Sequence, residues 1–107
     1  MTTTVRDDRA ESRYEIYDGE QLAGFADYRL DGGQLALTHT EVDPEFGGRG
    51  LARQLVGAAL DDARGRDLAV LPYCPYVRKV IAQNAAAYLD LVPETERERF
   101  GLAEVAR

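Results

Sequence analysis

Cysteine, histidine and tryptophan are scarce in this chain, whose 107 residues include one cysteine, one histidine and no tryptophan. Because Cys74 is the only thiol, no disulfide can form within the chain. Because His39 is the only imidazole, a zinc site of ordinary composition cannot be assembled. We therefore expect no metal in the functional site.

Long hydrophobic runs and an excess of positive charge are also lacking. No apolar run approaches the roughly 20 residues that cross a bilayer, and residues 1–8 lack the hydrophobic stretch of a signal peptide. The 19 acidic and 13 basic residues give a net charge of -6, which argues against general binding to nucleic acid or to anionic membranes. We expect a cytoplasmic protein with neither kind of partner.

Length and composition fit one compact domain, since 45% of the residues are apolar and 30% are charged. Residues 1–12 are polar and show no periodicity, so we predict a mobile N-terminal tail followed by one domain over residues 13–92. Residues 93–107 combine a Glu- and Arg-rich half with apolar Phe100, Leu102 and Val105. That composition fits either a docked helix or a disordered tail.

Three β-prone runs follow the predicted tail, beginning near Tyr14, Leu22 and Gln34. The turns between them contain glycines, which accept positive φ, and the pattern predicts an antiparallel meander of about three strands. Residues 34–42 alternate in the manner of a strand. Strict alternation would place Leu35, Leu37, His39 and Glu41 on one face and Ala36, Thr38, Thr40 and Val42 on the other.

From Gly50 to about Arg64 the hydrophobic period becomes helical, and Asp67–Leu71 is a short apolar run suited to one strand. Strand, helix and strand in this order predict a β-α-β unit with parallel pairing. A second helix is predicted to begin beside Cys74, with an apolar face formed by Val77, Val80, Ile81, Tyr88 and Leu89. The expected fold class is α+β.

The junction between the third strand and the first helix has three glycines in four positions, Gly47, Gly48 and Gly50. The first amides of a helix lack intrahelical partners and carry the positive end of its dipole, so the junction is suited to binding phosphate. Other phosphate-binding motifs fit poorly. An RNA-binding KH module has a helix before its G-x-x-G loop, whereas a strand precedes it here. A nucleotide-binding P-loop is excluded because no Gly-Lys-Ser/Thr follows the glycines. A dinucleotide fingerprint is excluded because Arg53 occupies the place of its third glycine.

The strand that leads through Gly48-x-Gly50 into a helix resembles the acyl-CoA signature of the GNAT superfamily of N-acetyltransferases. Three segments resemble, in order, the signatures of its minimal family of small acetyltransferases: His39-Thr40-Glu41-Val42, Gly48-Arg49-Gly50 and Cys74-Pro75-Tyr76-Val77. The resemblance covers about residues 13–92. It implies a GNAT-like acyl-CoA N-acyltransferase fold, acetyl-CoA as co-substrate and an amine as acceptor.

The expected coenzyme site is built around this junction. The pyrophosphate would lie on backbone amides at the start of the helix, with nearby arginines adding charge-assisted contacts. The resemblance implies that the pantetheine arm runs along the backbone of Glu41 and Val42. The predicted coenzyme-binding residues are Val42, Phe46, Gly47, Gly48, Arg49, Gly50, Leu51, Ala52, Arg53, Arg78 and Lys79, although the last two also fit a solvated charged face.

Three residues are candidates for catalysis. Acetyl transfer requires the amine to lose a proton, and Glu41 and His39 are candidate acceptors of that proton. Cys74, at the predicted start of the second helix, could line the thiol end of the coenzyme, accept the acetyl group covalently, or be an inert buried thiol.

The chain also departs from the wider superfamily. Glu45 stands where Gln or Arg is usual, and Ile81 stands at the position of the usual tyrosine acid, a role that we do not transfer to Tyr88. The alternative function is a catalytically inactive coenzyme-binding sensor or interaction module. The identity of the amine and the oligomeric state stay open.

Overall fold

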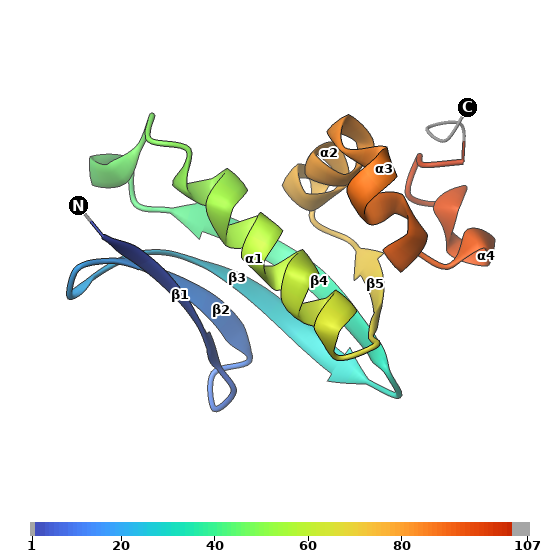
Figure 1. Cartoon of the computed structure of the whole chain (residues 1–107), viewed down its shortest axis with the longest axis horizontal. Helices are drawn as coiled ribbons and strands as arrows, with labels where there is room; N and C mark the ends of the chain where they lie inside the picture. The colour runs from blue at the N-terminus through green and yellow to red at the C-terminus, as the bar shows by residue number, and fades with distance from the viewer. Residues whose placement is uncertain (1, 104–107) are drawn as a thin grey trace.

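Four antiparallel strands and one parallel strand form a mixed sheet in the computed structural model, which describes residues 2–103 (Figure 1). The antiparallel strands are β1 (Thr3–Asp8), β2 (Arg13–Asp18), β3 (Gln21–Asp31) and β4 (Gln34–Val42). β5 (Ala69–Pro72) pairs parallel with β4, so the strand order is β1-β2-β3-β4-β5. The predicted α+β class, with a meander followed by a β-α-β unit, is confirmed.

β1 corrects the prediction of an unstructured N-terminal tail. Thr3–Asp8 pairs along its whole length with β2, so the meander has four strands rather than about three. Val5 packs against the core, and Asp7 accepts a hydrogen bond of 2.6 Å from the hydroxyl of Tyr28. The polar composition concealed this strand, because an edge strand with a single apolar residue gives almost no alternation signal.

The helix predicted after the glycine-rich junction is α1 (Leu51–Gly65), which lies across one face of the sheet (Figure 1). Its buried residues recur at the helical period seen in the sequence: Leu51, Leu55, Val56, Ala59, Leu60 and Ala63. The hydroxyl of Tyr14 in β2 donates a 2.7 Å hydrogen bond to Asp62, which shows that Tyr14 faces α1. None of the helices within residues 2–103 has both the length and the apolar composition needed to cross a membrane.

The chain after β5 forms short helical segments beside the parallel edge of the sheet (Figure 1). They are α2 (Pro75–Gln83), α3 (Ala85–Tyr88), the 3-10 helix η2 (Leu89–Leu91) and α4 (Glu94–Arg97). The second helix therefore ends before Tyr88 and Leu89, which were predicted to lie on its apolar face, because Asn84 leaves the helical region at φ -137°. Its side-chain amide donates to the carbonyl of Val80 at 2.9 Å.

The C-terminal segment is docked as far as the structure describes it. Phe100 and Leu102 are buried in the core cluster, which favours docking over disorder for residues 93–103. Val105 lies outside the described residues.

A β-bulge in β4 shifts the register halfway along the strand. Tyr28 of β3 pairs with Leu37, but the preceding Asp27 pairs with His39, which leaves Thr38 without a partner in β3. An inserted residue of this kind reverses the alternation of the strand beyond it.

The bulge decides which face of the sheet the candidate catalytic residues occupy. Directly paired residues share a face, and Tyr14, Ala26 and Thr40 form one such row across β2, β3 and β4. Thr40 therefore faces α1, whereas His39 and Glu41 point away from it. The prediction that these two residues share a face is confirmed, but the prediction that Leu35 and Leu37 lie on that same face is wrong, because strict alternation does not allow for the insertion.

Candidate functional site

The turn between β4 and α1 leaves the first backbone amides of α1 without side-chain partners. A 3-10 helix, η1 (Pro44–Phe46), follows β4 and is capped by Asp43, whose carboxylate accepts a 2.9 Å hydrogen bond from the amide of Glu45. Gly50 is the N-cap residue of α1, and no side chain caps this helix. The turn therefore offers unpaired N–H donors at the positive end of the helix dipole.

Two glycines keep the space over these amides open. Gly48 and Gly50 have φ values of 78° and 72°, in the left-handed region that favours glycine. A Cβ atom built at either position would meet no atom within 4 Å. The residues of this turn therefore fit a bulky phosphate-bearing ligand.

The side chains of the turn are arranged around this opening. Arg49 donates to the carboxylate of Asp18 at 3.0 Å, and its guanidinium carbon lies 5.7 Å from the centroid of the Phe46 ring. Phe46 and Leu51 are buried, so a ligand over the turn would meet their backbone rather than their side chains. Arg53 is exposed in the first turn of α1.

β4 and β5 diverge next to this turn. Their parallel pairing ends at Leu37 and Pro72, and the amide of Cys74 then donates to the carbonyl of Leu37 at 2.9 Å. β4 continues past this point to Val42 and reaches η1. Residues 38–42 of β4, which lead to the glycine turn, are therefore not paired with β5.

Cys74 is buried at the point where the pairing of β4 and β5 ends. It is the N-cap residue of α2, its exposed fraction is 4%, and its Sγ donates to the Thr40 hydroxyl at a distance of 3.5 Å. Because Thr40 faces α1, the thiol lies on the α1 side of β4.

His39 and Glu41 form a pair on the opposite face of β4. The distance from His39 Nε2 to Glu41 Oε1 is 3.2 Å, and both side chains are more than half exposed. The His39 ring also lies 6.1 Å from the ring of Phe25, which is the direct partner of Glu41 in β3. The three predicted catalytic residues are therefore split by the backbone of β4, with Cys74 on one side and the His39–Glu41 pair on the other.

The remaining predicted residues lie on α2 or near it. Arg78 donates to the carbonyl of Tyr73 at 3.4 Å, so its guanidinium lies at the start of α2, and Lys79 is exposed. Ile81 is fully buried in the core. Tyr88 packs against α1, with its hydroxyl 3.6 Å from a Cβ built at Gly57.

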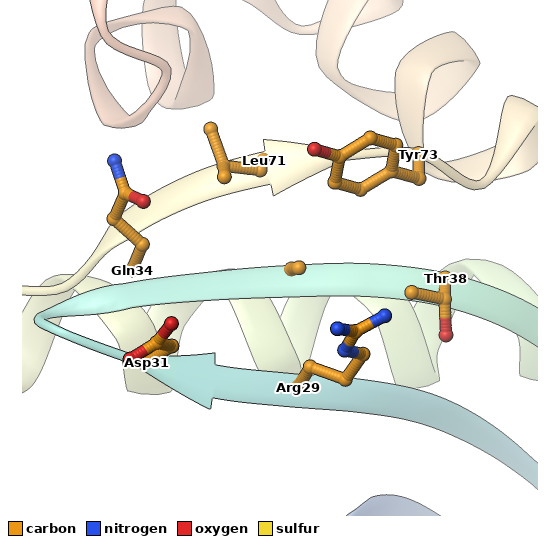
Figure 2. A pocket seen from close by; sticks show the side chains of 7 residues that line it. Arg29, Asp31, Gln34, Thr38, Leu71 and Tyr73 are labelled. Carbon is orange, nitrogen blue, oxygen red and sulfur yellow. The ribbon is translucent and has the colours of Figure 1, made fainter.

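A cavity of about 450 Å³ opens on the face of the sheet away from α1 (Figure 2). Arg29 and Asp31 of β3 line one side, Gln34 and Thr38 of β4 line the floor, and Tyr73 lies at the far wall. Arg29 is paired with Ala36, and Ala36 with Leu71, so this row of the sheet faces the cavity.

Sequence reasoning missed Thr40 as the partner of Cys74 and missed the cavity altogether. The spacing of Arg29 and Asp31, two residues apart on a strand, places both on one face and is a signal that could have been read. The position of Thr40 could not be read in this way, because it depends on the bulge at Thr38.

The comparisons with known proteins agree with this geometry. A family model described as GCN5-related N-acetyl-transferase matches residues 13–91. The fold is similar to the NMR solution structure of a GCN5-like protein from Staphylococcus aureus, with a TM-score of 0.61 and 25% sequence identity, covering 84% of this chain and 87% of that chain.

Curated relatives match over a shorter region. Protein NATD1 from Xenopus tropicalis is 42% identical over 48 residues, which are 45% of this chain and 44% of that protein. Human Protein NATD1 is 42% identical over 48 residues, or 42% of that protein. The match thus spans less than half the length of these relatives, whereas the family model covers most of the present chain. On the family match and the shared fold, the chain belongs to the GCN5-related N-acetyltransferase family.

Proposed function

We propose that this protein transfers an acetyl group from acetyl-CoA to a primary amine. The observation that carries the proposal is the set of open amides at the N-terminus of α1, which follows the part of β4 that is not paired with β5. Membership of the family supports the class of reaction.

In the proposed complex, the pyrophosphate of the coenzyme lies on the amides of residues 47–52, where the glycines leave room for it. We propose that Arg49 and Arg53 add charge-assisted contacts, with Arg78 and Lys79 of α2 as further candidates. The peptide-like pantetheine arm follows the edge of β4 at Glu41 and Val42. Its thiol end then lies toward Cys74.

The proposed reaction is direct transfer. The amine nitrogen bonds to the acetyl carbonyl carbon, the bond between that carbon and the CoA sulfur breaks, and the sulfur leaves as a thiolate that takes up a proton. A lysine-like amine has a pKa of about 10.4 and is mostly protonated at neutral pH, so it must first lose a proton. We assign that proton to the His39–Glu41 pair, which is exposed on the face where an amine can approach.

Cys74 has a different proposed role. A helix N-terminus such as that of α2 helps to stabilise a thiolate, but a cysteine nucleophile also needs a base that takes its proton. The hydrogen-bond partner of Cys74 is instead the hydroxyl of Thr40, and the His39–Glu41 pair lies across β4. We therefore propose that Cys74 lines the thiol end of the coenzyme site and is not acetylated during turnover.

Calorimetry with acetyl-CoA, combined with a thiol-release assay over a panel of primary amines, tests this proposal. We expect acetyl-CoA to bind and thiol release to depend on the amine, with the N-acetylated product identified by mass spectrometry. Binding without acetylation of any amine would instead support a catalytically inactive coenzyme-binding sensor or interaction module. Absence of binding would contradict both.

A further inference from the structure

We propose that the cavity of Figure 2 is the acceptor pocket and that it binds the head group of a free amino acid whose side chain carries a second amine. Arg29 binds the carboxylate of this amino acid and Asp31 binds its α-ammonium group. The side-chain amine then extends toward the His39–Glu41 pair. This inference rests on the proposed acetyl transfer and adds the substrate class.

The location of the cavity is the first argument. Arg29, Ala36 and Leu71 form one row of the sheet on the face away from α1. His39 and Glu41 point to the same face, and Thr38 lies between them and this row along β4. A molecule in the cavity can therefore reach the proposed proton acceptor without crossing the sheet.

The charges of the cavity are the second argument. Within residues 2–103, the side chains of Arg29 and Asp31 form neither an ion pair nor a hydrogen bond, with each other or with any neighbour. By contrast, Arg6 and Arg13 on the same sheet both bind Glu15. Two unpartnered and opposite charges in one cavity complement the two charges of an amino acid, and the planar guanidinium matches a carboxylate.

The length and polarity of the cavity are the third argument. Ala36, opposite Arg29, is three residues from His39, a separation of about 10 Å along the strand at about 3.3 Å per residue. The Arg29 side chain extends along the sheet toward Thr38 and shortens this gap (Figure 2). Leu71 and the Tyr73 ring give the intervening wall an apolar surface. An aliphatic chain of the length found in ornithine or lysine fits this space.

The C-terminal segment holds the Tyr73 ring in place. The Phe100 ring packs edge-on against it at 5.1 Å, and Arg99 donates to the Tyr73 hydroxyl at 2.7 Å. The far wall of the cavity is therefore fixed before any ligand binds, which lowers the entropy cost of binding.

Acetylation kinetics with three related amines test the proposed head-group contacts. L-Lysine has both charges of the head group, 1,5-diaminopentane lacks the carboxylate, and 6-aminohexanoate lacks the α-amine. Loss of one charge-assisted contact is expected to raise KM by about tenfold for each of the two analogues relative to L-lysine. Equal KM values for the three amines would overturn the inference while leaving acetyl transfer to amines intact.

Variants at Arg29 and Asp31 assign the contacts to these side chains. We expect Arg29→Gln to raise the KM for L-lysine by about tenfold, with kcat and the KM for 1,5-diaminopentane unchanged. Arg29→Lys should recover part of the loss. Asp31→Asn should raise the KM for L-lysine but not the KM for 6-aminohexanoate. Arg9→Gln is the matched control, because Arg9 is exposed near the β1–β2 turn and binds Asp7. Equal effects of Arg29→Gln on all three amines would contradict the assignment.

An NMR titration tests the pocket without relying on turnover. We expect L-lysine to shift the backbone amide signals of residues 29–38 in the wild type and not in Arg29→Gln, at concentrations where 1,5-diaminopentane has no effect. If no amine is acetylated, the proposed function fails, yet this titration still decides whether the cavity binds an amino acid. Absence of lysine-dependent shifts in the wild type would overturn the inference.

Discussion

Thr40 and Glu41 are neighbours in sequence, yet the first contacts the thiol of Cys74 and the second lies with His39 on the far face of β4. In the proposed mechanism this separation divides two tasks. Cys74, on the α1 side, lines the place of the leaving sulfur, and the His39–Glu41 pair on the open face accepts the proton of the amine. A substitution at Cys74 or at Glu41 therefore tests each task separately.

Glu41→Gln removes the carboxylate and keeps the size of the side chain. We expect kcat to fall by about a hundredfold, the scale of general-base catalysis, with little change in the Kd for acetyl-CoA, because Glu41 contributes only backbone to the proposed coenzyme path. Steady-state kinetics and calorimetry measure the two quantities. Glu20→Gln, an exposed carboxylate in the β2–β3 turn, is the control. Unchanged kcat in Glu41→Gln would remove this residue from the mechanism.

Cys74→Ala tests whether the acetyl group passes through the thiol. With direct transfer, the variant keeps measurable turnover, and intact-protein mass spectrometry of the wild type mixed with acetyl-CoA shows no acetylation of Cys74. Cys74→Ser is a second variant that keeps a hydroxyl near Thr40. An acetylated wild type together with inert variants that still fold would establish the covalent route instead.

At the scale of elements, the start of α1 depends on backbone conformation more than on side chains. Gly50 is the N-cap residue in the left-handed region, and the amides beyond it are not capped. An isolated helix end of this kind is stable in water, where solvent satisfies the amides, and it is available to an anion for the same reason.

Gly50→Leu places a large side chain over these amides. We expect affinity for acetyl-CoA to fall by at least tenfold, because the side chain occupies the space that is now open. Left-handed backbone also costs a non-glycine residue about 1 to 2 kcal/mol of stability. Gly32→Leu is the matched control, since Gly32 has φ 55°, open space around it and a place in the β3–β4 turn. Equal binding by wild type and Gly50→Leu would show that the turn is not the phosphate site.

The elements differ in how far the sequence predicted them. α1 was predicted to within one residue at each end, because an apolar stripe over fifteen residues leaves little choice of period. β1 was missed, since Val5 alone marks its buried face. The bulge at Thr38 was also missed, because an inserted residue carries no signature when the flanking residues are themselves β-prone.

At the scale of the whole molecule, the face of the sheet away from α1 carries charge rather than a second layer of helices. Its β2 portion is held by Glu15, which is 2% exposed and accepts hydrogen bonds from Arg13, Tyr17 and Arg6. This cluster ties β1 to β2, since Arg6 is the direct partner of Glu15. It closes one end of the surface that also holds the His39–Glu41 pair.

The candidate site was predictable in its parts and not in its assembly. Gly48, Gly50, Cys74, His39 and Glu41 were each named as candidates from local signals and from the family resemblance, and their roles stay predictions. Their distribution over two faces depends on the register between β3 and β4, a property of the paired strands. The pairing of β3, β4 and β5 was predicted, but not that the side chains of Arg29, Asp31 and Tyr73 line one cavity on these strands.

The Glu15 cluster predicts how the stability of the fold depends on pH. Burial alone would raise the pKa of Glu15, but the hydrogen bonds from Arg13, Tyr17 and Arg6 outweigh it and hold this pKa below its usual range. A carboxyl group with a lowered pKa in the folded state stabilises the fold above its unfolded pKa of about 4.3, and this contribution is lost as the pH falls through the folded pKa. The free energy of unfolding of the wild type, measured with urea, should therefore fall progressively below about pH 4.5.

Glu15→Gln separates this cluster from the other carboxyl groups. We expect the variant to lose about 2 kcal/mol of unfolding free energy at pH 7, because the amide keeps one acceptor oxygen but replaces the other with a donor and removes the negative charge that the two guanidinium groups share. On acidification the variant should lose less unfolding free energy than the wild type, because residue 15 no longer binds a proton on unfolding. Glu11→Gln, in the exposed β1–β2 turn, is the control and should keep the wild-type pH profile. If Glu15→Gln and the wild type lost stability in parallel between pH 7 and pH 3, the acid sensitivity would have to arise elsewhere. Asp90 would then be the next group to substitute, because its hydrogen bond from Arg64 lowers its pKa.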